Sequence, residues 1–158
     1  MLKERKKNRL KGFDYTSDRL YFVTSCTQDK NHFFGEIINQ KMICNEIGLI
    51  ACEQWIWLQQ QFPYIISHGF VIMPNHIHAV LEIRSENIVG QKIKPLSDLI
   101  GAYKTTSSKQ IHLSGNNEFK WQRSFHDHII RNEQSYWNIL NYIENNPKNW
   151  RNDRFFND

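Results

Sequence analysis

Two histidines separated by one residue are the first side chains that could do chemistry. His76 and His78 follow Pro74-Asn75 and open the apolar run HIHAVLEI. On a strand, alternate residues point to the same face, so both imidazoles project to one side with Cα atoms roughly 6–7 Å apart. Two ring nitrogens at that separation can converge on one divalent cation. The alternative interpretation is a pair of partly buried strand histidines without a ligand.

A second His-x-His pair, His126 and His128, lies in a more polar stretch near the C-terminus. It is either a competing metal pair or the second wall of the same site, because the strands of a small sheet lie close together. The isolated histidines are expected to be ordinary surface or core residues; they are His32, His68 and His112.

One tyrosine in the last expected helix stands apart from its apolar stripe. The stripe has the spacing i, i+3, i+4, i+7 and consists of Tyr136, Ile139, Leu140 and Ile143. Tyr142 lies roughly 100° from the centre of that stripe, so its hydroxyl can reach a neighbouring cleft. Asn146 follows one turn later and shares the face of Tyr142. The alternative is a boundary tyrosine that only packs its ring.

Aromatic and basic residues interleave in FKWQRSF at residues 119–125. This pattern is expected where bases stack and phosphates are bound. It is equally expected of a strand whose aromatic face belongs to the core. The pattern alone leaves both interpretations open.

The net charge of +4 is unevenly distributed along the chain. Residues 1–12 carry +5 and residues 84–131 carry +4, whereas residues 13–83 carry −4. Two basic blocks favour a surface that faces a polyanion, because Lys and Arg release counterions from phosphates. A solubilising tail and a solvated helix face would produce the same numbers.

Length and composition predict one soluble globular domain at residues 13–158, preceded by a basic N-terminal arm at residues 1–12. The chain has 158 residues, of which 40% are apolar and 23% charged. No apolar run is long enough for a membrane span, and the basic N-terminus lacks the apolar stretch of a secretory signal. Three cysteines without a C-x-x-C pair argue against disulfides and cysteine-bound zinc. We therefore expect a cytoplasmic protein.

The elements that must position these residues follow from periodicity and breakers. Alternating or β-branched runs predict strands at residues 20–26, 65–73, 76–83 and 121–130. Helical spacing predicts helices at residues 35–62, 96–113 and 135–145. The order β-α-β-β-α-β-α is typical of a ferredoxin-like α+β sandwich. We expect an antiparallel sheet of four or five strands with helices on one face.

Four stretches, taken together and in order, resemble a known family. They are VIMPNHIHAVLEI, LSDLIGAYK, WQRSFHDHIIR and NYIENNP. The chain resembles the HUH single-tyrosine transposases from about residue 21 to residue 147, and within them most closely the REP-associated tyrosine transposases. The joint occurrence of the four stretches is far more specific than any one of them.

The resemblance implies a role for each residue of the first two groups. His76 and His78 match the metal-binding histidines of the HUH motif, Tyr142 matches the nucleophile, and Asn146 matches the residue that completes the metal site. The ligand types alone suit zinc or manganese. The resemblance implies Mg²⁺ or Mn²⁺. His128 matches a recurrent position with a structural or DNA-contacting role.

The implied partner is single-stranded DNA that forms a hairpin, bound by a monomer or a homodimer without a membrane. The residues expected to contact DNA are Lys104, Lys120, Arg123, His128 and Arg131. After Pro147 the chain lacks the V-R-A-G-L-like continuation of some relatives. Residues 1–12 are therefore a candidate for part of the hairpin recognition.

The implied reaction is an attack of the Tyr142 oxygen on a phosphodiester, which yields a 5′-phosphotyrosine and a free 3′-hydroxyl. The adduct keeps the energy of the phosphodiester, so a second 3′-hydroxyl can reverse the step and join strands. A histidine-triad hydrolase would need H-x-H-x-H, and Val80 occupies the third position. The remaining alternative is a catalytically silent module of the same fold that binds hairpin or single-stranded nucleic acid.

Overall fold

A four-stranded antiparallel sheet forms the centre of the molecule. The computed structural model describes residues 19–84 and 92–158. The strands are β1 (Arg19–Cys26), β4 (Ile65–Met73), β5 (His76–Ile83) and β6 (His126–Ile129). Their order across the sheet is β4-β5-β1-β6, and every neighbouring pair is antiparallel. This is the strand order of a ferredoxin-like sandwich, so the predicted fold class is confirmed.

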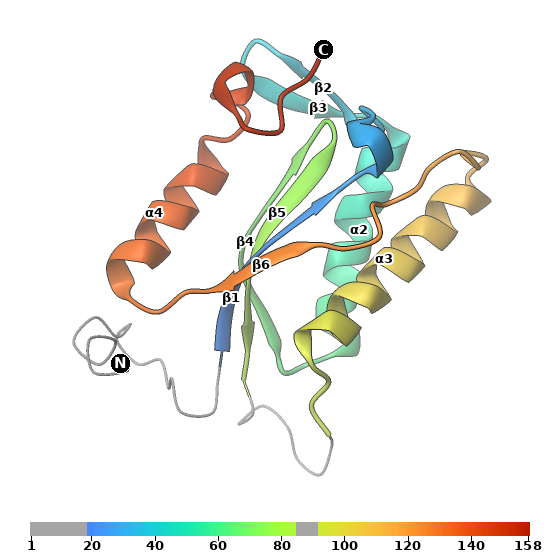
Figure 1. Cartoon of the computed structure of the whole chain (residues 1–158). Helices are drawn as coiled ribbons and strands as arrows, with labels where there is room; N and C mark the ends of the chain where they lie inside the picture. The colour runs from blue at the N-terminus through green and yellow to red at the C-terminus, as the bar shows by residue number, and fades with distance from the viewer. Residues whose placement is uncertain (1–18, 85–91) are drawn as a thin grey trace.

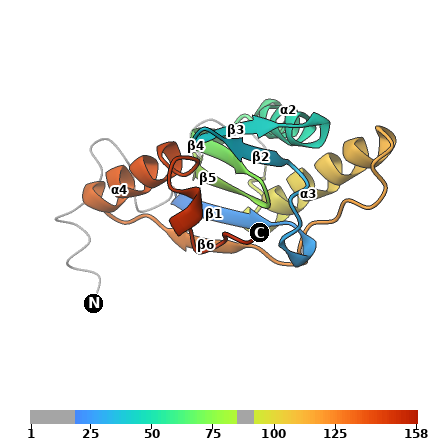
Figure 2. The ribbon, with the colours of Figure 1, turned by 90° about the horizontal axis from the view of Figure 1, so that it is seen from above.

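The helices cover both faces of this sheet, which corrects the expectation of helices on one face (Figures 1 and 2). The elements α2 (Glu46–Gln61) and α3 (Leu96–Leu113) pack on one face, and α4 (Glu133–Glu144) packs on the other. The physical reason lies in β5, where all eight residues are buried. A strand that is buried on both sides needs a cover on both sides. The stripe of α4 supplies the second cover by packing on Leu20 and Val80.

The predicted helix at residues 35–62 is wrong in its first third. Residues there form a hairpin of β2 (Gly35–Ile38) and β3 (Lys41–Cys44), separate from the main sheet. Asn39 and Gln40 have φ values of 51° and 64°, which is the left-handed conformation of a two-residue hairpin turn. Asn45 then caps α2, because its side chain accepts a hydrogen bond from the Gly48 amide at 2.9 Å. The period-two alternation of the hairpin is therefore easily mistaken for the start of the helical period that follows.

Most other boundaries agree with the sequence-based predictions. Strands at residues 65–73 and 76–83 and the helix at residues 96–113 are found as predicted. The last strand is shorter than predicted, because Trp121 makes only an isolated bridge to Thr27 while its ring packs against the core. The last helix begins two residues early, where the Asn132 side chain accepts from the Ser135 amide at 2.8 Å. Short 3-10 turns at Gln28–Lys30 and Trp150–Asn152 complete the described elements.

Close contact between α4 and the sheet sets the position of the tyrosine helix. A Cβ atom on Gly69 of β4 would lie 3.0 Å from Leu140 Cδ2, so the helix approaches the strand to a distance that a larger residue would prevent. The described cysteines Cys26, Cys44 and Cys52 are free, as expected. Among the described residues, no helix has the length and apolar character of a membrane span. The basic arm at residues 1–12 lies outside the described residues.

Candidate active site

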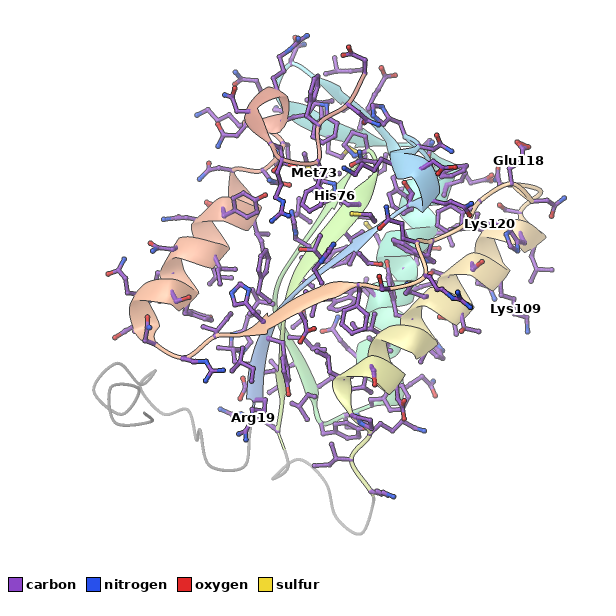
Figure 3. The ribbon with its side chains drawn as sticks, viewed as in Figure 1. Arg19, Met73, His76, Lys109, Glu118 and Lys120 are labelled. Atoms are coloured by element: carbon purple, nitrogen blue, oxygen red, sulfur yellow. The ribbon has the colours of Figure 1, made fainter. Side chains whose placement is uncertain are left out.

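The two histidines of the first pair meet at the start of β5. His76 and His78 are buried, with exposed fractions of 0% and 1%, and their Nε2 atoms lie 3.1 Å apart. Both imidazoles lie on one face of the strand, as the alternation predicted. Figure 3 shows His76 at the end of the sheet where β4 turns into β5.

Hydrogen bonds at the Nδ1 atoms orient both rings. Asn75 Oδ1 accepts from His76 Nδ1 at 2.7 Å, and the Asn75 amide group in turn donates to the Phe155 carbonyl at 2.8 Å. An amide oxygen can only accept, so the proton of a neutral His76 is on Nδ1 and its Nε2 carries a lone pair. Thr24 Oγ1 holds His78 Nδ1 at 2.6 Å. Partners at the far nitrogen orient metal-binding histidines in this way.

Asn146 brings a third donor atom to the two imidazoles. Its side chain is 1% exposed, and its Nδ2 donates to Asp153 Oδ1 at 3.2 Å. Its Oδ1 is buried without a hydrogen-bond partner. The Asn146 amide also interacts with His76, where it partly opposes the lowering of the His76 pKa by burial. An orphaned buried amide oxygen is costly unless a ligand satisfies it.

Tyr142 projects from α4 toward the same place. Its side chain is 39% exposed, and its ring centroid lies 5.2 Å from that of His78. The Tyr142 hydroxyl donates to Asp153 Oδ1 at 2.6 Å. Burial raises the pKa of Tyr142, and the hydrogen bond and charge of Asp153 raise it further. The phenol therefore keeps its proton at neutral pH in this arrangement.

Asp153 is the site residue that sequence reasoning missed. Its Oδ2 lies 3.9 Å from His76 Nε2, while its Oδ1 accepts from both Tyr142 and Asn146. No motif or periodicity distinguishes it in the sequence, because it belongs to an irregular segment after the last helix. Its position depends on how the chain returns over the sheet.

The returning segment, Trp150 to Asn157, covers the imidazoles. The Phe155 ring centroid lies 4.7 Å from that of His76 and 5.8 Å from that of His78. Asn157 secures the end of the segment, because its Oδ1 lies 2.6 Å from His32 Nε2. This cover desolvates the rings, and desolvation lowers the pKa of His76 to about 4 despite the opposing Asp153 charge. Burial, followed by the neighbouring His76, lowers the pKa of His78 as well. Both rings are neutral at pH 7, as metal ligands must be.

The second histidine pair forms part of the same site. His126 and His128 line a pocket of about 330 Å³ together with His78, Tyr142 and Arg154. The structure thus favours the second-wall interpretation of this pair. Within residues 19–84 and 92–158, no group of three or more His, Cys, Asp or Glu side chains has the geometry of a metal site. The candidate metal ligands are consequently two imidazoles and an amide oxygen.

A hydrogen-bonded group at the other end of α4 anchors that helix. His68 Nδ1 lies 2.8 Å from the Tyr136 hydroxyl oxygen, and His68 Nε2 lies 2.6 Å from Glu82 Oε1. Glu82 is 2% exposed and accepts a second bond from Arg84 at 2.6 Å. His68 is therefore more than the isolated histidine that its sequence context indicated: it ties the helix that carries Tyr142 to β4 and β5.

The residues expected to contact DNA fall into separate environments. The Lys104 ammonium donates to the main-chain carbonyls of residues 122–124, so it organises a loop. Lys120 and Arg123 are exposed on that loop, and His128 lines the Tyr142 pocket. Arg131 is half-buried just before α4. In the interleaved stretch the aromatic rings pack against the core, whereas the basic side chains face outward.

Acid is expected to destabilise the fold through the buried histidines. The pKa of His76 is about 4 in the folded state and near 6.5 when unfolded, so the unfolded chain takes up the proton first as pH falls. The contribution of neutral His76 to stability is present above pH 6.5 and is lost as pH falls toward 4, at a cost of about 3 kcal/mol. Urea unfolding at pH 7.5 and at pH 4.5 measures this loss of unfolding free energy.

The variant His76→Gln should lose less stability between these pH values than the native chain. The control His126→Gln should lose as much as the native chain. An unchanged loss in His76→Gln would contradict the assignment.

No family model matches the chain. An uncharacterized protein of Haemophilus influenzae is 35% identical and covers 98% of this chain and 94% of its own length. A second protein of that organism, provisionally named a REP-associated tyrosine transposase, is 27% identical over 85% of this chain and 73% of its own length.

Two solved structures share the fold. One is a REP-associated tyrosine transposase bound to a REP hairpin, with a TM-score of 0.58 and 21% identity over 82% of this chain and 67% of that one. The other is a provisionally named transposase from Deinococcus radiodurans, with a TM-score of 0.53 and 17% identity over 86% of this chain and 96% of that one.

Proposed function

We propose that this chain, which is similar to REP-associated tyrosine transposases in sequence and in fold, is a metal-dependent enzyme that nicks and rejoins single-stranded DNA through Tyr142. The observation that carries the proposal is the orphaned oxygen of Asn146. Asn146 and Tyr142 both donate to Asp153 Oδ1, and Asp153 Oδ2 lies 3.9 Å from His76 Nε2, which is 3.1 Å from His78 Nε2. These four groups are what a metal-assisted tyrosine nucleophile requires.

The donor set fits a divalent cation. Two neutral imidazoles and one amide oxygen would hold Mg²⁺ or Mn²⁺ and leave positions for phosphate oxygens and water. Asn75 and Thr24 would keep the ligand rings in place through their bonds to the Nδ1 atoms. The bound cation supplies opposing charge to the phosphate oxygens and favours the phenolate form of a nearby tyrosine.

The side chains of the chain itself account for the proton movements. Tyr142 attacks phosphorus, its O–P bond forms, and the bond from phosphorus to the 3′-oxygen breaks. The phenolic proton passes to Asp153, which already accepts it in a hydrogen bond. The departing 3′-oxygen takes up that proton from Asp153 and leaves as a hydroxyl. The reverse attack by another 3′-hydroxyl releases Tyr142 and joins two strands.

The proposed substrate is single-stranded DNA with a hairpin, as in the solved relative that holds a REP hairpin. Lys120, Arg123 and Arg131 are the proposed backbone contacts, with His128 beside the reacting tyrosine and Lys104 holding the loop.

A second candidate function is hairpin binding without cleavage. One observation favours it: the Tyr142 hydroxyl is engaged by Asp153, and the segment Trp150 to Asn157 covers both imidazoles. A strand can reach the metal ligands only after that segment moves. Binding with the cover in place would leave the tyrosine unreacted.

An adduct assay distinguishes the two functions. The protein is mixed with end-labelled hairpin oligonucleotides taken from the flanks of its own gene, in Mn²⁺, in Mg²⁺ and in a chelator. We expect a protein–DNA adduct that survives a denaturing gel in the presence of metal and is absent with the chelator. Tight binding without an adduct in either metal would assign the protein to the binding function.

A further inference from the structure

Arg154 is a charged residue at the reacting tyrosine to which the proposed function assigns no role. It lines the pocket of about 330 Å³ that also contains Tyr142 and His78. Among the described residues of that lining, Arg154 is the only Lys or Arg. Its side chain is exposed, so a ligand that enters the pocket can reach the guanidinium.

The chain around Arg154 is held in place on both sides. Asp153 Oδ2 accepts a hydrogen bond from the Phe155 amide at 3.1 Å, which closes a tight turn with Arg154 at its centre. The Phe155 side chain is buried, and the Arg154 guanidinium carbon lies 5.1 Å from the centroid of its ring. Asn157 Nδ2 donates to the Lys30 carbonyl at 3.0 Å and so secures the end of the segment. These contacts give the guanidinium a defined place in the pocket.

The positive charge of Arg154 is available to a ligand. In the part of the chain that the structure describes, no carboxylate forms an ion pair with it. Asp127 borders the same pocket, but it alternates with His126 and His128 along β6. Alternate residues of a strand point to opposite faces, so the Asp127 side chain is directed to the other face of the sheet. Burial raises the pKa of Tyr21, and Asp127 on that face raises it further.

Negative charge accumulates where the proposed reaction takes place. The Tyr142 hydroxyl donates to Asp153 Oδ1 at 2.6 Å, so an anionic phosphodiester has to approach a tyrosine that is already beside a carboxylate. During phosphoryl transfer, negative charge is spread over the non-bridging oxygens of phosphorus. A guanidinium binds two such oxygens with parallel hydrogen bonds, and it keeps its charge at any physiological pH. Arg154 is therefore a suitable group for this position.

We propose that Arg154 is a catalytic residue that binds the scissile phosphate, with its guanidinium donating to both non-bridging oxygens while Tyr142 attacks; this inference rests on the proposed function. It adds no bond and no proton to that reaction. The O–P bond to Tyr142 forms, the bond to the 3′-oxygen breaks, and the phenolic proton passes through Asp153 to the leaving oxygen.

The position of Arg154 also implies an order of events. The segment Trp150 to Asn157 carries Arg154 and lies over the imidazoles, beyond the end of α4 (Figure 1). Arg154 lines the Tyr142 pocket in this closed position. The strand therefore enters before the segment closes, and closure brings the guanidinium to the phosphate.

The first test compares Arg154→Gln with the native chain. Arg151→Gln is the matched control, because Arg151 is an exposed arginine of the same segment that borders a different pocket. The measurement is the rate of adduct formation in a single turnover, with saturating DNA and Mn²⁺. Loss of one donor to a developing oxyanion lowers the rate by about 100-fold or more, and we expect about this effect for Arg154→Gln. Arg154→Lys should recover part of the rate, because it keeps the charge but not the two parallel donors.

The second test identifies the phosphate that Arg154 binds. Each oligonucleotide of a set carries one methylphosphonate, in which a methyl group replaces a non-bridging oxygen and the charge is lost. Binding is measured in a chelator, so no cleavage is needed. A methylphosphonate at the cut site should weaken binding to the native chain by about tenfold or more, the value of a charged hydrogen bond. Arg154→Gln should not respond at that position, and Arg151→Gln should respond as the native chain does.

Two results would overturn the inference. One is adduct formation by Arg154→Gln at the rate of Arg151→Gln. The other is a methylphosphonate effect at the cut site that has the same size in Arg154→Gln and in the native chain. If the native chain forms no adduct, but one methylphosphonate position weakens its binding and not that of Arg154→Gln, the phosphate contact is supported and the proposed nicking function alone is refuted.

Discussion

Tyr142→Phe is expected to abolish the covalent adduct while DNA affinity stays within about twofold of the native value. The substitution removes one oxygen, which is the proposed nucleophile, and keeps the ring that contacts His78 and Phe22. Without that oxygen no bond to phosphorus can form, so the loss should be complete in every metal. The measurement is the denaturing-gel adduct assay, combined with hairpin binding in a chelator.

Trp137→Phe and the other tyrosine of α4 provide the controls for Tyr142. Trp137 is exposed on the same helix, so its replacement should leave the adduct intact. Tyr136→Phe removes the hydroxyl bonded to His68 and should lower the rate of adduct formation without abolishing it, because it loosens the helix. Full adduct formation by Tyr142→Phe would transfer the nucleophile to another residue; loss of DNA binding would make Tyr142 a structural residue.

His78→Ala should lower the Mn²⁺ affinity of the free protein by at least about 100-fold and eliminate the adduct. Loss of an outer partner of a metal ligand typically costs 10–100-fold in affinity, and removal of a ligand costs at least as much. His78 is placed for this role by its Nε2 atom, 3.1 Å from that of His76, and by Thr24 at its other nitrogen. Titration of Mn²⁺ followed by electron paramagnetic resonance measures the affinity without DNA.

Two further variants make the metal experiment specific. Asn146→Ala removes the orphaned amide oxygen and should also weaken Mn²⁺ binding, while it relieves the buried unsatisfied atom. The control is His112→Ala, which removes an imidazole of α3 that hydrogen-bonds to the Phe119 carbonyl. This variant should keep the native Mn²⁺ affinity. Native affinity in both His78→Ala and Asn146→Ala would show that the metal, if bound, lies elsewhere.

The two histidine pairs differ in how much the sequence pattern predicted about them. Alternation along β5 correctly predicted that His76 and His78 share a face, because two residues on one strand have a nearly fixed separation. The same reasoning left His126 and His128 between two roles. Their place beside Tyr142 depends on the pairing of β6 with β1, which no local pattern encodes.

The hairpin at residues 35–44 shows where local pattern misleads. Its apolar residues satisfy both a strand period and a helical period over so short a distance. The left-handed backbone at Asn39 and Gln40, together with the cap at Asn45, decided in favour of the hairpin. The pair Asn39-Gln40 is not a strong turn signal by itself.

By itself, the sequence determined the central strands, the long helix of residues 96–113, the shared face of the two histidines, and the outward position of Tyr142 relative to its stripe. These features follow from the period of one element and from its breakers. Only the tertiary structure decided that α4 covers the second face, that Asp153 joins Tyr142 to Asn146, that His68 anchors the tyrosine helix, and that Phe155 desolvates the imidazoles. Each of these contacts links segments distant in sequence or lies in irregular chain. Such contacts depend on how the whole core packs, and no local sequence period encodes that packing.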